Sequence, residues 1–130
     1  MSGVRTGVIH DTRRRRGEHI EWEMYPQYCR EKRSIVGGNY DCSTVLGEIA
    51  ATGQLTQLDL AASDGSEVAV AVLYNPTDAS AGPVSGTVTE CQVIYREEYL
   101  LWPAGITDGQ KATAIKQLNQ AGGQKVRSAN

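Results

Sequence analysis

The sequence contains no phenylalanine and only two tryptophans, although 40% of its 130 residues are hydrophobic. Alanine, valine and leucine supply much of this apolar content, and 14 residues are glycine. We therefore expect a single domain with a thin core, since a chain of this length leaves no room for a second one. Such domains often gain stability by associating with copies of themselves or with a larger surface, so the composition favours an oligomer.

Histidine is scarce as well, because His10 and His19 are the only two and both lie near the N-terminus. The remainder of the chain has no imidazole for a general base, a catalytic triad or a metal site. Motifs of phosphate-binding loops, dinucleotide-binding folds, zinc proteases and serine hydrolases are also absent. The sequence predicts no catalytic residue, no metal site and no cofactor, and an enzyme is the least favoured functional class.

Long apolar runs are missing too, and no run approaches the ~20 residues of a membrane span. No apolar stretch follows the N-terminal arginines as it would in a secretory signal, so we expect synthesis in the cytoplasm and no membrane partner. The three cysteines, Cys29, Cys42 and Cys91, are spaced for neither a disulfide framework nor a zinc motif. We interpret them as reduced structural thiols, with one intramolecular disulfide as the alternative.

Charge divides the chain into two segments. Residues 1–33 contain eight Lys or Arg and five Asp or Glu, whereas residues 34–130 contain five and ten. The first segment also shows no sustained apolar period, which predicts an extended N-terminal arm without a core element. Residues 34–130 are expected to form the folded body.

Four consecutive arginines, Arg13, Arg14, Arg15 and Arg16, are the sharpest charge feature of the arm. Three interpretations are open: a solvated tether, docking on an acidic protein surface, and contacts to nucleic-acid phosphates. The body is acidic and offers no stacking platform for bases, so nucleic acid is the least favoured of the three.

The stretch "HIEWEMYPQY" (residues 19–28) alternates the apolar Ile20, Trp22 and Met24 with Glu21 and Glu23. This alternation is typical of a strand, yet no strand partner lies nearby in the sequence. Two interpretations are again open. Either the segment adds an edge strand to another chain through backbone hydrogen bonds, or Trp22 folds back onto its own body.

The body contains several short strand-like runs, which predicts a mainly β, α+β fold with one helix. Runs at residues 43–50 and 54–62 precede a turn signal at Asp64-Gly65. The run "EVAVAVLY" (67–74) is apolar on both faces and is expected to be buried on both. Residues 75–86 are predicted to be a loop, and residues 87–102 a single strand that Trp102-Pro103 ends.

The helix that follows has distinct end signals. Thr107 or Asp108 can cap its N-terminus, and Gly122-Gly123 can end it in the left-handed conformation. Its inward face is predicted to carry Ala112, Ile115 and Leu118.

Three motifs stand in order along the body: Val45-Leu46-Gly47, then Asp64-Gly65-Ser66 with the Ala/Val run after it, then Leu101-Trp102-Pro103. Shorter stretches, "TDAS" (77–80), "QLNQAGG" (117–123) and "QKVR" (124–127), lie between and after them. In this order and spacing, residues 34–127 resemble the head decoration proteins of tailed phages.

This resemblance implies a small β-clip-like body with little regular structure, which forms a homotrimer. The trimer would bind the major capsid protein at three-fold and quasi-three-fold sites of the mature, expanded phage head, on the outer surface of the virion. There it would stabilise the head against internal DNA pressure, and its N-terminal region would order on the capsid. The motif residues would be structural: Val45, Leu46, Gly47, Asp64, Gly65, Ser66, Trp102 and Pro103.

The resemblance and the pattern of the arm together assign capsid contact to one set of side chains. This set consists of Arg13, Arg14, Arg15, Arg16, Ile20, Trp22, Met24, Tyr25, Tyr28, Ile35 and Val36. The alternative function is a small nucleic-acid-binding module that acts through the arginine-rich arm.

Overall fold

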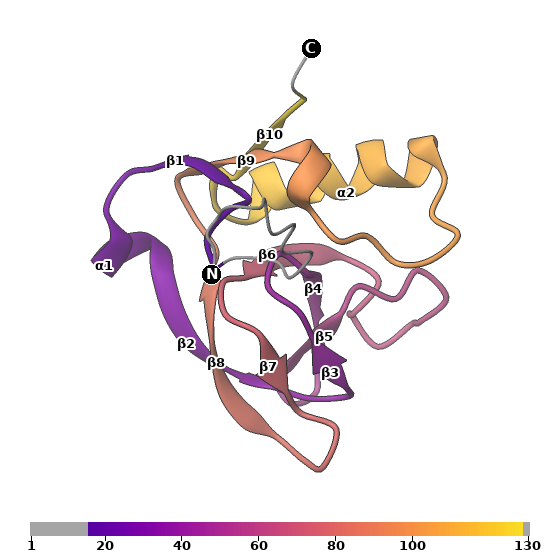
Figure 1. Cartoon of the computed structure of the whole chain (residues 1–130). Helices are drawn as coiled ribbons and strands as arrows, with labels where there is room; N and C mark the ends of the chain where they lie inside the picture. The colour runs from indigo at the N-terminus through magenta and orange to yellow at the C-terminus, as the bar shows by residue number, and fades with distance from the viewer. Residues whose placement is uncertain (1–15, 129–130) are drawn as a thin grey trace, which may run out of the picture.

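The computed structural model describes residues 16–128 of the chain. This part is mostly β with one main helix, which confirms the predicted α+β class (Figure 1). In chain order the elements are β1 (Ile20–Glu23), α1 (Pro26–Cys29), β2 (Arg30–Ile35), β3 (Asn39–Tyr40), β4 (Val45–Glu48), β5 (Leu55–Gln57), β6 (Ala69–Leu73), β7 (Thr77–Asp78), β8 (Val84–Thr89), β9 (Val93–Arg96), the 3-10 turn η1 (Glu97–Tyr99), α2 (Asp108–Gly122) and β10 (Lys125–Arg127). The described body therefore has more regular structure than the resemblance implies.

Strands β2, β5, β4, β6 and β8 form a closed barrel in that order. β2 and β8 pair antiparallel from Arg30, opposite Thr89, to Ile35, opposite Val84. β4 pairs antiparallel with β5 on one side and with β6 on the other. A cluster of buried side chains, here called the barrel core, consists of Ile35, Leu46, Leu55, Ala71, Leu73, Ala79 and Val88.

A second cluster, here called the helix core, joins the barrel to α2. The sheet β1-β9-β10 completes this side of the molecule, with β9 in the middle, antiparallel to β1 and parallel to β10 (Figure 1). The helix core consists of Val45, Leu58, Ala69, Val72, Val93, Tyr95, Leu100, Ala114 and Leu118. β6 contributes to both clusters, as its two apolar faces predict, since Ala71 and Leu73 belong to the barrel core and Val72 to the helix core.

Tyr95 is the largest fully buried side chain, and its hydroxyl group is hydrogen-bonded inside the helix core. The hydroxyl donates to the Gln124 side-chain oxygen at 2.5 Å and lies 2.9 Å from the Thr89 hydroxyl. The Gln124 amide in turn donates to the backbone oxygens of Val70 (2.9 Å) and Leu118 (3.3 Å). Burial raises the pKa of Tyr95, so the phenol stays protonated as a donor. This network connects β9 and β8 to β6 and to the end of α2.

The ends of α2 follow their sequence signals. Thr107 accepts from the Gln110 backbone N–H at 3.1 Å, while the Gln110 side chain accepts from the Thr107 backbone, which forms a capping box. Gly123 ends the helix with φ 72°, a left-handed conformation that glycine adopts without strain. The predicted inward face is partly wrong, because Ala114 and Leu118 are the buried helix residues, whereas Ile115 is half-buried and Ala112 is exposed.

Residues 75–102 differ from the expected loop and single strand. The predicted loop contains β7, which pairs with β3, and the first residues of β8. The predicted strand is broken by a bend at residues 90–92, where Gln92 has φ 49°, so that β8 stays in the barrel and β9 crosses to the sheet with β1. Both differences arise because the strand partners lie far away in the sequence.

The structure also corrects the expectation that the first segment lacks core elements. β1 pairs antiparallel with β9, with Ile20 opposite Tyr95 and Glu23 opposite Val93. His19 and Cys29 are fully buried. The expected boundary between residues 33 and 34 falls inside β2, a barrel strand. Residues 16–33 are therefore part of the fold.

Candidate partner-binding surface

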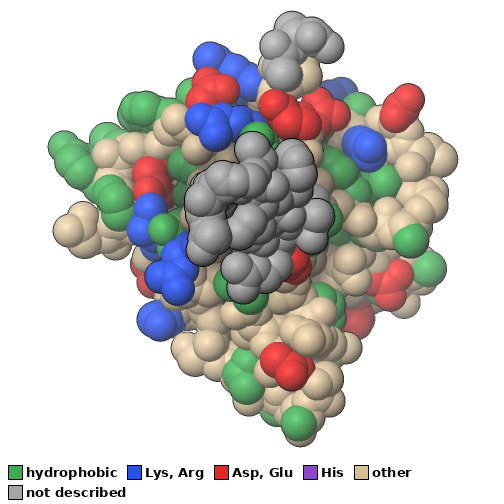
Figure 2. Space-filling view, viewed as in Figure 1, with side chains coloured by type: hydrophobic (Ala, Val, Ile, Leu, Met, Phe, Trp, Pro, Cys, Tyr) green, Lys and Arg blue, Asp and Glu red, His purple; other side chains and the backbone are tan. Residues whose placement is uncertain are grey.

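Four exposed apolar side chains lie close together in the segment that joins β1 to β2. Trp22, Met24, Tyr25 and Tyr28, here called the aromatic patch, are 51%, 49%, 61% and 63% exposed. Figure 2 shows hydrophobic side chains gathered at the edge of the molecule where Figure 1 places α1. Contiguous exposed apolar groups mark interaction sites, and aromatic residues and methionine are enriched in protein interfaces.

Hydrogen bonds at both ends hold the segment that carries the aromatic patch. On the β1 side, the Met24 backbone N–H donates to Gln92 O at 3.0 Å. At the turn, Tyr28 N and Cys29 N donate to Tyr25 O at 3.0 and 2.8 Å, which forms the short helix α1 behind Pro26. The patch is thus presented from an ordered backbone, and binding a partner would cost little further backbone entropy.

An ion pair and a cation–π contact tie the base of the patch to the barrel. The Arg30 guanidinium donates to the Glu23 carboxylate and lies 4.1 Å from the centroid of the Tyr74 ring. A cation–π contact at a partly exposed site contributes about 0.5–1 kcal/mol. Arg30 therefore links the end of β1, the start of β2 and the residue after β6.

The two arginines of β2, Arg30 and Arg33, are engaged within the protein. Arg33 pairs with Glu90 at 2.7 Å and with Glu48 at 3.0 Å, and it also donates to Gly53 O at 3.3 Å. Among the cations of the described part of residues 1–33, Arg16 and Lys32 are exposed. Within residues 16–33, only part of the positive charge is therefore open to a partner.

The remaining residues assigned to capsid contact lie in different environments. Arg13, Arg14 and Arg15 lie outside the described residues. Ile20 is half-buried against the helix core, and Val36 is half-buried after β2. Ile35 is fully buried in the barrel core, so the structure contradicts its assignment to a contact surface.

Of the two interpretations of residues 19–28, folding back onto the protein's own body is correct for the backbone only, and addition of an edge strand to another chain stays a prediction. The backbone of β1 pairs with β9 of its own chain, but the Trp22 side chain remains half exposed. In the sheet β1-β9-β10, β1 is an edge strand within residues 16–128.

The three motifs meet at β4. A Cβ atom on Gly47 would lie 2.2 Å from Ser66 O, so only glycine allows the backbones of these two motifs to approach. The backbone N–H of Val45 donates to Leu101 O at 3.1 Å, and Trp102 packs against the helix core. The three motifs thus form one continuous contact across the chain.

The turn at Asp64 is closed by its own side chain. The carboxylate accepts from the Ser66 hydroxyl at 2.5 Å and from the Ser66 backbone N–H at 3.0 Å, and these bonds lower the pKa of Asp64. Asp78 and Ser80 repeat the arrangement at 2.5 and 3.0 Å, and the pKa of Asp78 is lowered for the same reason. The side-chain bonds that close both turns therefore join residues only two positions apart.

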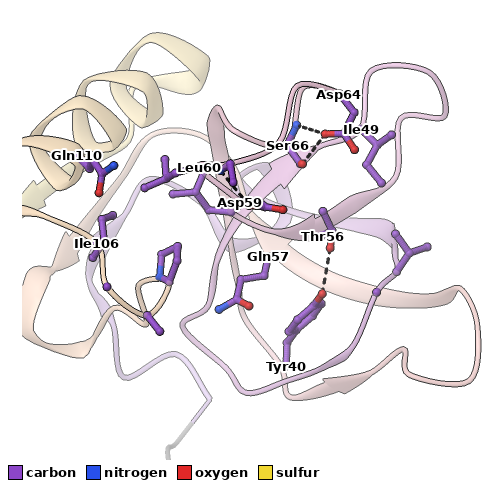
Figure 3. Close-up of a pocket in the computed structure, with 17 residues that line it drawn as sticks. Tyr40, Ile49, Thr56, Gln57, Asp59, Leu60, Asp64, Ser66, Ile106 and Gln110 are labelled. Carbon is purple, nitrogen blue, oxygen red and sulfur yellow. Dashed lines mark hydrogen bonds between the residues drawn. The ribbon is translucent and has the colours of Figure 1, made fainter.

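A groove of about 800 Å³ lies beside the first of these turns (Figure 3). Strand β5 and residues 59–66 form one wall, and residues 103–110 form the other. Tyr40 reaches its rim, where the hydroxyl lies 3.0 Å from that of Thr56. Val36, Asp64, Ser66 and Pro103 line the groove, whereas its further residues, such as Ile106 and Gln110, have no signal in the sequence.

Groups capable of chemistry are few in the described structure. His19 Nδ1 lies 2.9 Å from the Ser43 hydroxyl, but both residues are fully buried and closed to a substrate. Within residues 16–128, no group of three or more His, Cys, Asp or Glu side chains could hold a metal ion. Over the same residues, no helix has the length and apolar character needed to cross a membrane.

Comparison with known proteins yields one family. The model of the family described as bacteriophage lambda head decoration protein D matches residues 9–123, which include the aromatic patch, the barrel and α2. No curated protein matches the chain.

Proposed function

Because the chain belongs to the family of bacteriophage lambda head decoration protein D and is thus a phage head decoration protein, we propose that it attaches to the head as a homotrimer and stabilises it. The partner is the major capsid protein at three-fold and quasi-three-fold sites of the expanded head. The protein is made in the host cytoplasm and acts on the outer surface of the virion. The family match over residues 9–123 is the observation that carries this proposal.

The aromatic patch is the surface that we assign to the capsid. Trp22, Tyr25 and Tyr28 are large, exposed and held by an ordered backbone. Tryptophan and tyrosine supply much of the energy of protein interfaces, because they exclude water over a large area while losing little side-chain entropy. Arg13 to Arg16 are proposed as further contacts, to an acidic surface of the capsid.

Trimer formation strengthens attachment through the aromatic patch, because a trimer carries three copies of the patch. Once one subunit has docked, the other two patches are held near their own sites at high effective concentration. Attachment then persists even if a single contact is weak, and it is strongest where the lattice presents three sites at the correct separation. This geometry explains why an expanded head would be bound and a precursor head would not.

The acidic body and the paired arginines of β2 support a structural role over nucleic-acid binding. Arg30 and Arg33 already bind carboxylates of their own chain. A phosphate would have to displace these partners, which would offset the gain from counterion release. We propose that the protein is not an enzyme and that it requires no cofactor.

Two measurements test the proposed attachment. Light scattering of the purified protein should give the mass of a trimer, and the trimer should sediment with expanded heads but not with precursor heads. Bound heads should also withstand heat better than bare heads. A monomer that sediments with neither kind of head would refute the proposal.

A variant of the aromatic patch tests whether this patch is the surface that binds the capsid. The triple variant Trp22→Ala, Tyr25→Ala, Tyr28→Ala should lose attachment, since each interface anchor contributes about 2 kcal/mol. Tyr99→Ala is the matched control, because Tyr99 is also exposed but lies in η1. Equal attachment of both variants would show that another surface binds the capsid.

A further inference from the structure

Two cysteines that are far apart in the sequence meet at the base of the aromatic patch. Cys29 is the last residue of α1 and is fully buried, whereas Cys91 lies in the bend between β8 and β9 and is partly exposed. The β2–β8 ladder ends at the pair Arg30–Thr89, and just beyond it Glu90 N donates to Cys29 O at 3.1 Å. The two cysteines therefore flank the same end of the ladder.

Their thiol groups lie at this end of the β2–β8 ladder as well. Cys29 Sγ is 3.6 Å from Gln92 O, the oxygen of the residue after Cys91. Cys91 Sγ is 3.7 Å from Tyr28 O, the oxygen of the residue before Cys29. Each sulfur thus reaches the backbone beside the other cysteine. Burial raises the pKa of the Cys91 thiol, and contact with the Cys29 thiol raises it further.

We propose that Cys29 and Cys91 form an oxidisable dithiol, which a small disulfide such as oxidised glutathione converts into an intramolecular disulfide. The Cys91 thiolate attacks one sulfur of glutathione disulfide, so that a mixed disulfide forms and one glutathione leaves as a thiolate. Cys29 then loses its proton and attacks the Cys91 sulfur, which displaces the second glutathione. Two protein thiols become one disulfide, and one glutathione disulfide becomes two thiols.

The order of attack follows from exposure. An oxidant in solution reaches Cys91 first, and the buried Cys29 acts as the resolving thiol. Because the pKa of Cys91 lies above its ordinary value of 9.0, little thiolate is present near neutral pH. The reaction is accordingly slow there, and its rate continues to rise as the pH is raised through 9.

The disulfide would act on the aromatic patch. It would fasten the end of α1 to the bend that precedes β9, and these are the two places from which the patch is held. A reducing cytoplasm keeps the thiols free, and an oxidising medium outside the cell closes the bond. Any change that the disulfide makes to capsid attachment through the aromatic patch rests on the proposed function, whereas formation of the bond does not.

Intact mass and peptide mapping test the dithiol on the full chain. After reduction, removal of reductant and incubation with oxidised glutathione, the wild type should lose the mass of two hydrogen atoms and yield a Cys29–Cys91 peptide. Cys29→Ser should instead retain one glutathione on Cys91, because the resolving thiol is gone. Cys91→Ser should form neither product. Cys42→Ala, which removes the cysteine between β3 and β4, should react as the wild type does.

Unfolding in guanidinium chloride gives an independent readout. Oxidation should move the midpoint of the wild type and of Cys42→Ala to higher denaturant, and should not move that of Cys91→Ser. A wild type that ends as a stable mixed disulfide, that links Cys42, or that keeps its reduced mass would overturn the proposal.

Sedimentation with expanded heads separates this proposal from the previous one. If the bond forms but neither redox form binds heads, the dithiol stands and the proposed function fails. If heads are bound but the bond never forms, the proposed function stands and the dithiol fails.

Discussion

The barrel and the segment that carries the aromatic patch use large apolar side chains in opposite ways. In the barrel, Leu46 and Leu73 are fully buried, and the strands close on one another. In the segment from β1 to α1, the backbone is anchored to β9 while Trp22, Tyr25 and Tyr28 face solvent. The comparison indicates that the barrel determines stability, and it supports the proposal that the segment binds a partner.

Truncating the barrel core should have the largest effect on stability. Leu46→Ala should lower the free energy of unfolding by about 3 kcal/mol, because the transfer energy of the side chain is lost and a cavity remains. Denaturant unfolding followed by circular dichroism measures the change. Val84→Ala, at a partly exposed position of β8, is the control and should change stability by less than about 0.5 kcal/mol. A loss below about 1 kcal/mol for Leu46→Ala would show that the barrel core is loosely packed.

Removing the buried hydroxyl group of Tyr95 should have the next largest effect. Tyr95→Phe preserves the ring but leaves the Gln124 side-chain oxygen without its 2.5 Å donor. An unsatisfied buried acceptor costs about 1–3 kcal/mol, which thermal or denaturant unfolding detects. Gln124→Ala also removes the amide bonds to Val70 O and Leu118 O, so it is destabilising by itself. Tyr95→Phe should nevertheless cost less in that background than in the wild type, because the acceptor is already gone. Fully additive losses would mean that the two side chains act independently.

The two aspartate turns should give a smaller effect that depends on pH. The pKa values of Asp64 and Asp78 are lowered by hydrogen bonds to Ser66 and Ser80, so their contribution is present above the ordinary value of 3.8. It is lost as the pH falls through the lower folded values. The double variant Asp64→Asn, Asp78→Asn should therefore flatten the acid branch of stability against pH. An unchanged acid branch would assign acid sensitivity to other carboxylates.

Features that depend on neighbouring residues could be predicted from the sequence. The Thr107 cap, the Gly123 stop and the Asp64 turn are closed by hydrogen bonds or backbone angles within a few residues. The two buried faces of β6 followed from its apolar pattern alone.

Features that depend on distant pairing could not be predicted in the same way. The bend at Gln92 exists because β8 and β9 join different sheets, and nothing local to "TECQVIY" signals the change. The partner of β1, the burial of Ile35 and the proximity of Cys29 to Cys91 could not be predicted either, because each depends on pairing between segments that are far apart in the sequence. The segment of the aromatic patch was assigned to a contact surface because Ile20, Trp22 and Met24 alternate with glutamates and no strand partner lies nearby in the sequence.

The smallest effect on stability is expected at the aromatic patch, and this prediction tests most directly how the patch differs from the barrel. Tyr25→Ala and Tyr28→Ala together remove more apolar surface than Leu46→Ala, yet both side chains are more than half exposed. Little of this surface is withdrawn from water on folding, so each change should alter the free energy of unfolding by less than about 0.5 kcal/mol. Denaturant unfolding of the isolated protein measures this change, and sedimentation with heads measures attachment. A destabilisation near that of Leu46→Ala would place the tyrosines in the core of an oligomer, whereas unchanged stability with lost attachment would assign them to the capsid.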